Sequence, residues 1–240
     1  MLAYRMATLT NTITAELQAL SQDEKRKMLP RFFKTGKGEY GEGDVFLGVV
    51  VPNVRNVARK HKAESLNEVS QLLGSAWHEV RLCGLIIMVE QFKRADDTMR
   101  KAIFDLYLSL TDRINNWDLV DLSCPSIVGA YLLDKSRDIL YQLAESTLLW
   151  DNRIAIVSTY TFIRNGQLED TFALATRMMV HKHDLMHKAI GWMLREAGKR
   201  NEQRLYKYIM QHRNTMPRTM LRYAIEKFPP NVRAQLMERS

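Results

Sequence analysis

A tryptophan and a carboxylate four residues apart form the most chemically suggestive pattern in the sequence. They are Trp117 and Asp121, within the segment RINNWDLVDLS at 113–123. If this segment is helical, the two side chains share one face, because residues i and i+4 are neighbours on a helix surface. Leu119 and Val120 precede Asp121, and a carboxylate on an apolar stretch requires a partner. We interpret the pair as a candidate catalytic site, although a tryptophan at such a position is also typical of structural packing.

A second tryptophan is flanked by cations at helical spacing. Lys188, Trp192 and Arg195 stand at i, i+4 and i+7, so a helix places them on one stripe. Cations beside an aromatic ring suit a nucleic acid, with charges for phosphates and a flat ring for a sugar or base. The pattern equally fits a core tryptophan covered by lysine and arginine stems. Arg153, at the start of another apolar helix, is a candidate partner for the carboxylate of Asp121.

The histidines and cysteines do not indicate a metal site. His183 and His187 have i,i+4 spacing near His181, but a zinc site needs a third or fourth ligand, and no H-E-x-x-H motif or cysteine pair is present. We therefore interpret these histidines as polar surface residues and predict neither a metal nor a cofactor. Cys83 and Cys124 lie in apolar surroundings and are predicted to be core thiols.

The segments that carry these side chains have helical periodicity. Apolar residues recur every three or four positions, and 6 prolines and 11 glycines separate segments of helical length. Only the glycine-rich segment 36–48 breaks the periodicity, and we predict a loop there. The predicted boundary signals are capping boxes at Ser21–Glu24 and Ser65–Glu68, first-turn prolines at Pro52 and Pro217, and glycine stops at Gly166 and Gly198.

From residue 65 the helices are predicted to form pairs. The second helices of these pairs are expected to begin near Trp77, Asn116, Asp151, Asp184 and Pro217. Intervals of roughly 33–39 residues are typical of HEAT-like α-solenoids, whose repeats bury their apolar faces by stacking. We therefore predict an all-α fold in a single domain, 1–240. It comprises N-terminal helices and the glycine-rich loop over 1–64, paired-helix repeats over 65–227, and a C-terminal helix over 228–240.

The charge distribution points to a polyanionic partner. The chain has 35 Lys+Arg and 27 Asp+Glu, a net charge of +8, and residues 181–240 hold 13 of the basic and 5 of the acidic residues. The whole surplus therefore lies in the last quarter, and a basic end on a neutral body suits an anionic polymer.

The remaining composition indicates a soluble protein. A hydrophobic content of 46% with 26% charged residues is ordinary for a globular domain. No apolar run approaches the ~20 residues of a membrane span, and the N-terminus lacks a signal-peptide pattern. Two cysteines form no disulfide framework, which fits a reducing compartment. We expect a cytoplasmic monomer without a membrane partner.

Four motifs, in this order, resemble the DNA alkylation repair family, in particular its HEAT-like alkylpurine DNA glycosylases of the AlkD type. The motifs are FLGVVVP at 46–52, NNWDLVD at 115–121, DNRIAIVS at 151–158 and KAIGWMLRE at 188–196. The resemblance implies a C-shaped solenoid whose concave, basic face holds double-stranded DNA. It also implies base excision repair chemistry, in which the N-glycosidic bond of cationic N3- and N7-alkylated purines is hydrolysed without base flipping.

The same resemblance implies roles for single residues. Trp117 and Trp192 would embrace the deoxyribose of the lesion, with Asp121 as the catalytic carboxylate between them. The DNA-binding residues expected beside them are Arg153, Arg195, Lys188 and Tyr40. Two other readings stay open, because a family fold does not guarantee the family reaction: a non-catalytic HEAT-repeat protein that binds unusual or damaged DNA, and a protein–protein scaffold.

Overall fold

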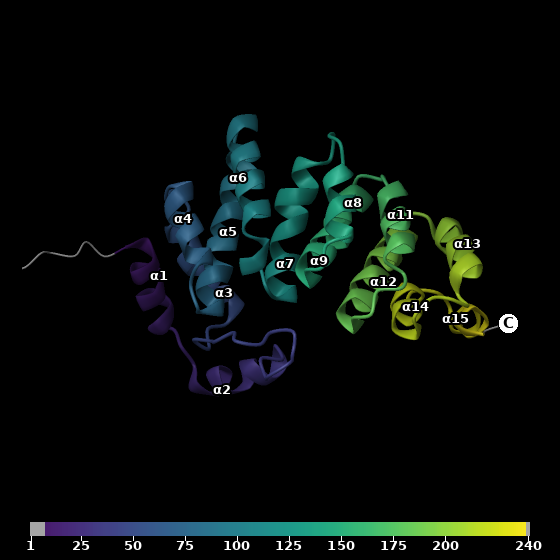
Figure 1. Ribbon diagram of the computed structural model, residues 1–240, viewed down its shortest axis with the longest axis horizontal. Coiled ribbons are helices and arrows are strands. Elements are labelled where there is room, and N and C mark those ends of the chain that lie inside the picture. The colour runs from purple at the N-terminus through teal and green to yellow at the C-terminus, as the bar shows by residue number, and fades with distance from the viewer. Residues whose placement is uncertain (1–7, 239–240) are drawn as a thin grey trace, which may run out of the picture. The chain divides into compact units, whose positions relative to one another are not determined.

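The computed structural model describes residues 8–238, and its regular secondary structure is helical (Figure 1). The described residues contain no β-strand, and Val45 and Trp77 form one isolated parallel bridge. The predicted all-α class is therefore confirmed. Contacts divide the chain into two compact units that meet in sequence at Ser123 and Cys124, here called the N-terminal and the C-terminal unit.

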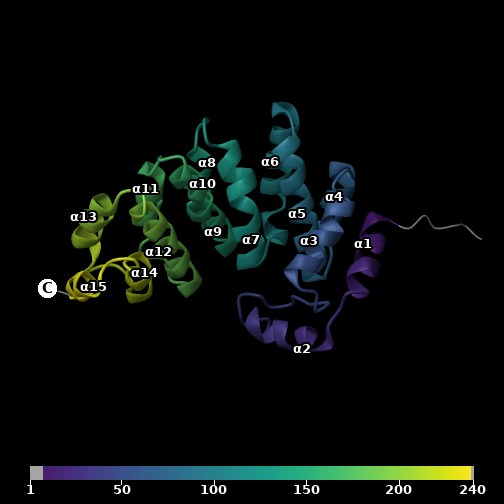
Figure 2. The same cartoon turned by 180° about the vertical axis from the view of Figure 1, so that it is seen from behind.

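The N-terminal unit is built around one long, buried helix, α5. The helices of this unit are α1 (Leu9–Gln18), α2 (Asp23–Phe32), α3 (Val51–Lys60), α4 (Leu66–Leu73), α5 (His78–Arg94), α6 (Asp97–Ser109), the 3₁₀ turn η1 (Thr111–Arg113) and α7 (Trp117–Cys124). Helices α1, α3, α4 and α6 all pack against α5 (Figures 1 and 2). Every residue from Val80 to Val89 is consequently buried, because α5 has neighbours on all sides.

The C-terminal unit has the same plan, with α12 at its centre. The helices of this unit are the π-helical turn η2 (Pro125–Gly129), α8 (Asp138–Ala144), α9 (Leu149–Val157), α10 (Thr159–Arg164), α11 (Glu169–Arg177), α12 (Asp184–Gly198), α13 (Glu202–His212), α14 (Arg218–Ala224) and α15 (Pro230–Met237). Helix α12 contacts α9, α10, α11, α13 and α14. Gly191 makes the α14 contact possible, since a Cβ there would lie 2.5 Å from the carbonyl oxygen of Met220.

Several predicted boundaries are confirmed. Ser65 and Glu68 form the complete capping box of α4. Pro52 occupies the first turn of α3, where its missing N–H leaves no helical hydrogen bond unmade. Gly166 follows α10 with a φ of +77°, the left-handed geometry that ends many helices. Residues 36–48 contain no helix, as predicted for the glycine-rich loop.

Other boundary predictions were wrong in detail. Ser21 does not cap α2: its hydroxyl donates to the carbonyl of Leu47, and Gln22 stands at the N-cap without a side-chain bond. A tertiary contact has therefore replaced the local one. Pro217 precedes α14 as its N-cap instead of occupying the first turn. The stop predicted at Gly198 is confirmed, since α12 ends there, although Gly198 does not have a positive φ.

The predicted helix pairs have the expected spacing. Helices α5, α7, α9, α12 and α14 each begin within two residues of the second-helix start inferred from the sequence. The division into HEAT-like repeats of one domain stays a prediction. Cys83 and Cys124 are both buried, as expected for core thiols, and burial raises the pKa of the Cys83 thiol to about 12.

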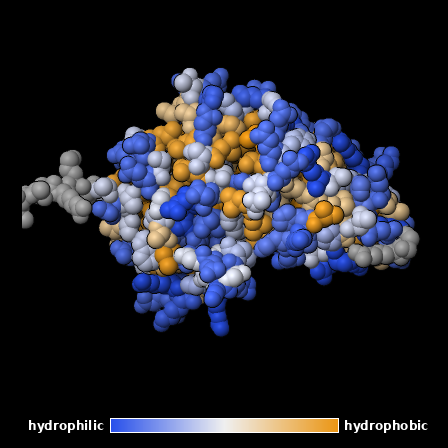
Figure 3. All heavy atoms as spheres, in the orientation of Figure 1, coloured by the Kyte–Doolittle hydropathy of each residue, from blue (hydrophilic) through white to orange (hydrophobic). Residues whose placement is uncertain are grey.

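The surface is hydrophilic where α2 lies. Six of the ten residues of this helix are charged, and the lower left of the space-filling view is accordingly dominated by hydrophilic side chains (Figure 3). Within 8–238, no helix combines the length and the apolar character that a bilayer crossing requires.

Candidate functional site

Helix α7 begins at Trp117, and the residue before it fixes this start. The side-chain oxygen of Asn116 accepts a hydrogen bond from the Trp117 amide at 2.9 Å, and the Asn116 carbonyl accepts from the amide of Val120 at 3.2 Å. The Asn116 side chain therefore satisfies the first amide of α7. Trp117 and Asp121 follow one turn apart on the same face of α7, and both are half-buried.

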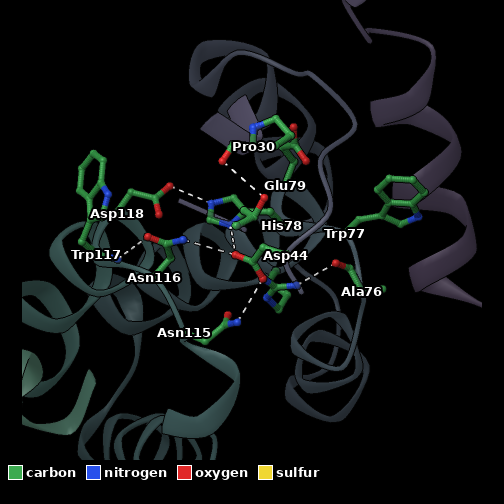
Figure 4. A network of polar contacts seen from close by, with 12 residues as sticks. Pro30, Asp44, Ala76, Trp77, His78, Glu79, Asn115, Asn116, Trp117 and Asp118 are labelled. Atoms are coloured by element: carbon green, nitrogen blue, oxygen red, sulfur yellow. Dashed lines mark hydrogen bonds and ion pairs between the residues drawn. The ribbon is translucent and has the colours of Figure 1, made fainter. Parts of the chain in front are cut away.

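A buried carboxylate, Asp44, joins the glycine-rich loop to α5 and to the start of α7 (Figure 4). Its Oδ1 accepts from Arg81 Nη2 at 2.5 Å and from Asn115 Nδ2 at 3.1 Å. Its Oδ2 accepts from His78 Nδ1 at 3.1 Å and from Asn116 Nδ2 at 3.4 Å. Burial opposes the charge of Asp44, but the donors outweigh it and hold the pKa of this carboxyl below its ordinary value.

His78 links this carboxylate to a second one on α7. Its Nε2 lies 2.9 Å from Oδ2 of Asp118, and its side chain is only 2% exposed. Burial disfavours the imidazolium, but the charges and hydrogen bonds of Asp118 and Asp44 raise the pKa of His78 to about 9. His78 is therefore a cation at neutral pH, and both ring nitrogens donate. In Figure 4, the Trp117 ring points away from this polar cluster.

Aromatic rings from the end of α2 lie against Trp117. Phe33 stacks on Trp117 with centroids 5.4 Å apart and on Phe46 with centroids 5.1 Å apart. Phe32 contacts Trp117 edge-on at 5.9 Å and is 55% exposed. The family resemblance implies Tyr40 as the aromatic of this region, and neither Phe32 nor Phe33 was predicted. The available signal was a pair of adjacent aromatics at the end of a highly charged helix.

The motif FLGVVVP wraps around a buried acid. Glu79 accepts hydrogen bonds from the backbone amides of Leu47 at 2.9 Å, Gly48 at 2.8 Å and Val49 at 3.1 Å. The carboxylate is therefore matched by three backbone donors that would otherwise be unpaired in the interior. This arrangement fixes the loop that carries Phe46 against α5, which also carries His78.

In the C-terminal unit, Trp192 lies on α12 beside a second aromatic residue. Trp192 is half-buried, and its ring centroid is 6.0 Å from that of Tyr160 on α10. Arg153 is buried on α9, and its Nη1 donates to the carbonyl of Leu185 at 2.9 Å. This bond ties α9 to the first turn of the helix that carries Trp192.

The two cations that flank Trp192 are both compensated by acids. Lys188 Nζ lies 2.8 Å from Oδ2 of Asp184, one turn earlier on α12. Arg195 forms ion pairs with Glu226 and, through Nε at 3.5 Å, with Glu196. A phosphate could therefore bind either cation only by displacing its carboxylate partner.

Three histidines, at 181, 183 and 187, make hydrogen bonds around the start of α12. His183 Nδ1 accepts from the amide of Leu185 at 3.2 Å and caps α12, while His187 Nε2 lies 2.5 Å from the carbonyl oxygen of His181. Burial lowers the pKa of both His181 and His183, which favours their neutral forms. Residues 8–238 contain no group of three or more His, Cys, Asp or Glu residues placed to hold a metal ion.

The structure thus brings the candidate residues together in two groups. Trp117 and Asp121 share α7, and Tyr40 lies half-buried in the loop of the same unit. The residues of the C-terminal unit are Lys188, Trp192 and Arg195, all on α12, and Arg153, whose side chain contacts the start of α12.

Fold and candidate site define an all-helical protein with a half-buried tryptophan of the candidate site in each of its two compact units. Residues 13–228 match the sequence model of a family described as DNA alkylation repair enzyme. The chain therefore belongs to the DNA alkylation repair enzyme family.

The fold is also found in a solved structure. A predicted DNA alkylation repair enzyme from Enterococcus faecalis superposes with a TM-score of 0.68 at 15% sequence identity, over 88% of this chain and 97% of that chain. A search of curated proteins gave no match.

Proposed function

We propose that the protein is a DNA glycosylase that hydrolyses the N-glycosidic bond of cationic N3- and N7-alkylated purines in double-stranded DNA, without base flipping. Family membership supports a role in DNA alkylation repair. The observation that carries the finer assignment is the pairing of Trp117 with Asp121 on one half-buried face of α7. The neighbouring carboxylate, Asp118, faces His78, whereas Asp121 shares the face of Trp117, so we assign the reaction to Asp121.

The residue types suit a leaving group that is already charged. An alkylated purine cation departs with the electron pair of the glycosidic bond and needs no protonation by a general acid. The barrier then lies in the positive charge that develops on the sugar. Asp121 would stabilise that charge and orient the attacking water. The faces of Trp117 and Trp192 would add cation–π attraction to the same sugar.

The cations assigned to DNA binding would contact the phosphate backbone. Arg153 would grip the phosphate near the lesion, and Lys188 and Arg195 would exchange their carboxylates for phosphates. Tyr40 would approach the lesion from the N-terminal unit. Phosphate contacts of this kind fix register without reading sequence, which fits an enzyme that must find lesions in any context. In this proposal the protein acts as a cytoplasmic monomer without metal or cofactor.

The test is release of 7-methylguanine from methylated duplex DNA. The wild type should release the base, and Asp121→Asn should lower the single-turnover rate about 10²–10³-fold, the loss seen when one preorganised electrostatic group is removed. Asp105→Asn is the matched control, because Asp105 is an exposed acid on α6. If the wild type bound DNA but released no 7-methylguanine, the glycosylase proposal would be refuted, and the non-catalytic DNA-binding function would remain. Equal rates for Asp121→Asn and the wild type would refute the assigned carboxylate.

The salt dependence of DNA affinity tests the partner. Each phosphate neutralised by a lysine or arginine releases counterions, so affinity should fall steeply as salt rises. Lys188→Gln should reduce the slope of log affinity against log salt by about one. An affinity that does not respond to salt would instead favour a protein–protein scaffold.

A further inference from the structure

An apolar pocket of about 470 Å³ lies beside Trp117, entirely within the N-terminal unit. This volume falls in the range of roughly 300–1,000 Å³ found for sites that hold small organic molecules. One wall is aromatic and consists of Phe32, Phe33, Phe46 and Trp117. The π faces continue from ring to ring, because Phe33 stacks between Trp117 and Phe46 with interplanar angles of 26° and 14°.

The mouth of the pocket exposes large apolar side chains. Met28 is 45% exposed, Phe32 is 55% exposed and Val51 is 42% exposed, and all three line the pocket. Large apolar side chains gathered on a monomer surface mark a binding site more often than isolated ones do.

The floor of the pocket is electrically balanced. The charged side chains among its lining residues are Lys25, His78, Glu79 and Asp118. Two cations and two carboxylates therefore cancel. The polar atoms of these residues lie beneath the apolar lining, as the buried Oδ1 of Asp118 does, so stacking is the main interaction that the pocket offers. An aromatic wall and a lining whose charges cancel suit a flat, uncharged ring system that can stack on the phenylalanines.

We propose that this pocket binds the free purine base released by the reaction, as a product site adjoining Trp117. The inference rests on the proposed function for the origin of the base. Hydrolysis breaks the bond between C1′ and the purine nitrogen. The electron pair of that bond stays with the purine and cancels the positive charge. The oxygen of the attacking water bonds to C1′, and the water releases one proton. The product is thus a neutral, planar base that is free to enter the pocket, whereas the lesion in DNA is still bonded to its deoxyribose.

The direct test is equilibrium dialysis with two probes in mildly acidic buffer. Free 7-methylguanine is the neutral product, and 7-methylguanosine keeps both the sugar and the positive charge. We expect the full-length wild type to bind 7-methylguanine at least tenfold more tightly than the nucleoside. Equal or tighter binding of the nucleoside, or no binding of the base, would overturn the product site.

Two matched variants locate the binding. Met28→Trp narrows the mouth, whereas Met99→Trp makes the same change on α6, at a methionine that is also 45% exposed and does not line the pocket. Met28→Trp should weaken 7-methylguanine binding at least tenfold, and Met99→Trp should leave it unchanged. Val51→Trp repeats the test from α3 if Met28→Trp folds poorly. Equal affinities in all three variants and the wild type would place the base elsewhere and overturn the proposal.

Product inhibition separates the two proposals. Added 7-methylguanine should slow excision by the wild type, and Met28→Trp should resist this inhibition while its uninhibited rate stays the same. If the wild type binds the base but excises nothing, the proposed function fails and the base site stands. If it excises normally and is not inhibited by the free base, the glycosylase stands and the product site fails.

Discussion

Nε2 of His78 lies 2.9 Å from Oδ2 of Asp118, and this contact joins the first residue of α5 to the first turn of α7. Because Asp118 directly follows Trp117, the position of the tryptophan depends on a buried imidazolium 39 residues earlier in the chain. The other ring nitrogen of His78 is bound to Asp44, so one cation fixes the loop, α5 and α7 together. Removing its charge should loosen all three.

The first prediction concerns stability at alkaline pH. The pKa of His78 rises from 6.5 to about 9 in the folded protein, so the folded state holds a proton that the unfolded state releases. Its stabilising effect is complete below about pH 6.5 and is lost as pH rises through about 9. We expect the free energy of unfolding to fall by up to about 3 kcal/mol across this window, measured by urea denaturation.

Two variants test the origin of this loss. His78→Gln should be less stable at neutral pH and should lack the His78 component of the alkaline decline. His61→Gln is the control, because His61 also lies between two acids, Glu16 and Glu64, but its side chain is 13% exposed. This control should keep the decline. If His78→Gln declined as steeply as the wild type, another group would be responsible.

The second prediction separates the two carboxylates of α7. Asp118→Asn should lower the free energy of unfolding by about 3–5 kcal/mol, because it leaves a buried cation with one counter-charge fewer. Asp121→Asn should change the rate of base release far more than the stability. Thermal unfolding and single-turnover release, measured on both proteins, provide the comparison. A reversed pattern, with Asp118→Asn stable but inactive, would exchange the roles of the two residues.

The third prediction concerns the acid inside the FLGVVVP loop. Glu79→Gln replaces one acceptor oxygen with an NH₂ group that faces backbone donors, so at least one amide loses its partner. We expect a loss of about 2–4 kcal/mol in urea denaturation, from unpaired and formerly charge-assisted bonds. Glu90→Gln is the matched control on α5, since its carboxylate pairs with Lys93 near the surface, and it should cost less than about 1 kcal/mol. Similar losses would mean that the three amides contribute little.

Local signals accounted for the helix boundaries that were predicted correctly. The capping box at Ser65, the first-turn Pro52 and the stop at Gly166 depend on neighbours within a few residues, so the sequence alone predicts them. The capping prediction at Ser21 was wrong because its hydroxyl is bound to the carbonyl of Leu47, 26 residues away. A capping pattern describes what a side chain can do locally and cannot include a competing tertiary acceptor.

The candidate site could be predicted only where it lies on one helix. The i,i+4 relation of Trp117 and Asp121 follows from periodicity, and so does the stripe of Lys188 and Trp192. The cluster around Asp44 could not be predicted, because its donors come from positions up to 72 residues away. The stacking of Phe33 on Trp117 could not be predicted either, because it depends on the conformation of the glycine-rich loop that follows α2.

The last prediction concerns that loop and uses two glycines with the same backbone conformation. Gly48 has a φ of +85° and Gly43 a φ of +86°, so an alanine at either position is strained. Left-handed geometry costs an alanine about 1–2 kcal/mol, and this should be the whole effect of Gly43→Ala, where a Cβ would meet nothing within 4 Å.

Gly48→Ala should cost clearly more. Its Cβ would lie 2.6 Å from the carbonyl oxygen of Gln22 and 2.7 Å from the amide nitrogen of Arg26, both backbone atoms of the α2 start that cannot rotate away. Helix α2 must then shift, and with it Phe32 and Phe33 at its far end. Urea denaturation should show a loss at least about 2 kcal/mol larger for Gly48→Ala than for Gly43→Ala, since overpacking at rigid contacts typically costs 1–3 kcal/mol. Equal losses would show that the close approach of α2 to the loop contributes nothing beyond backbone strain.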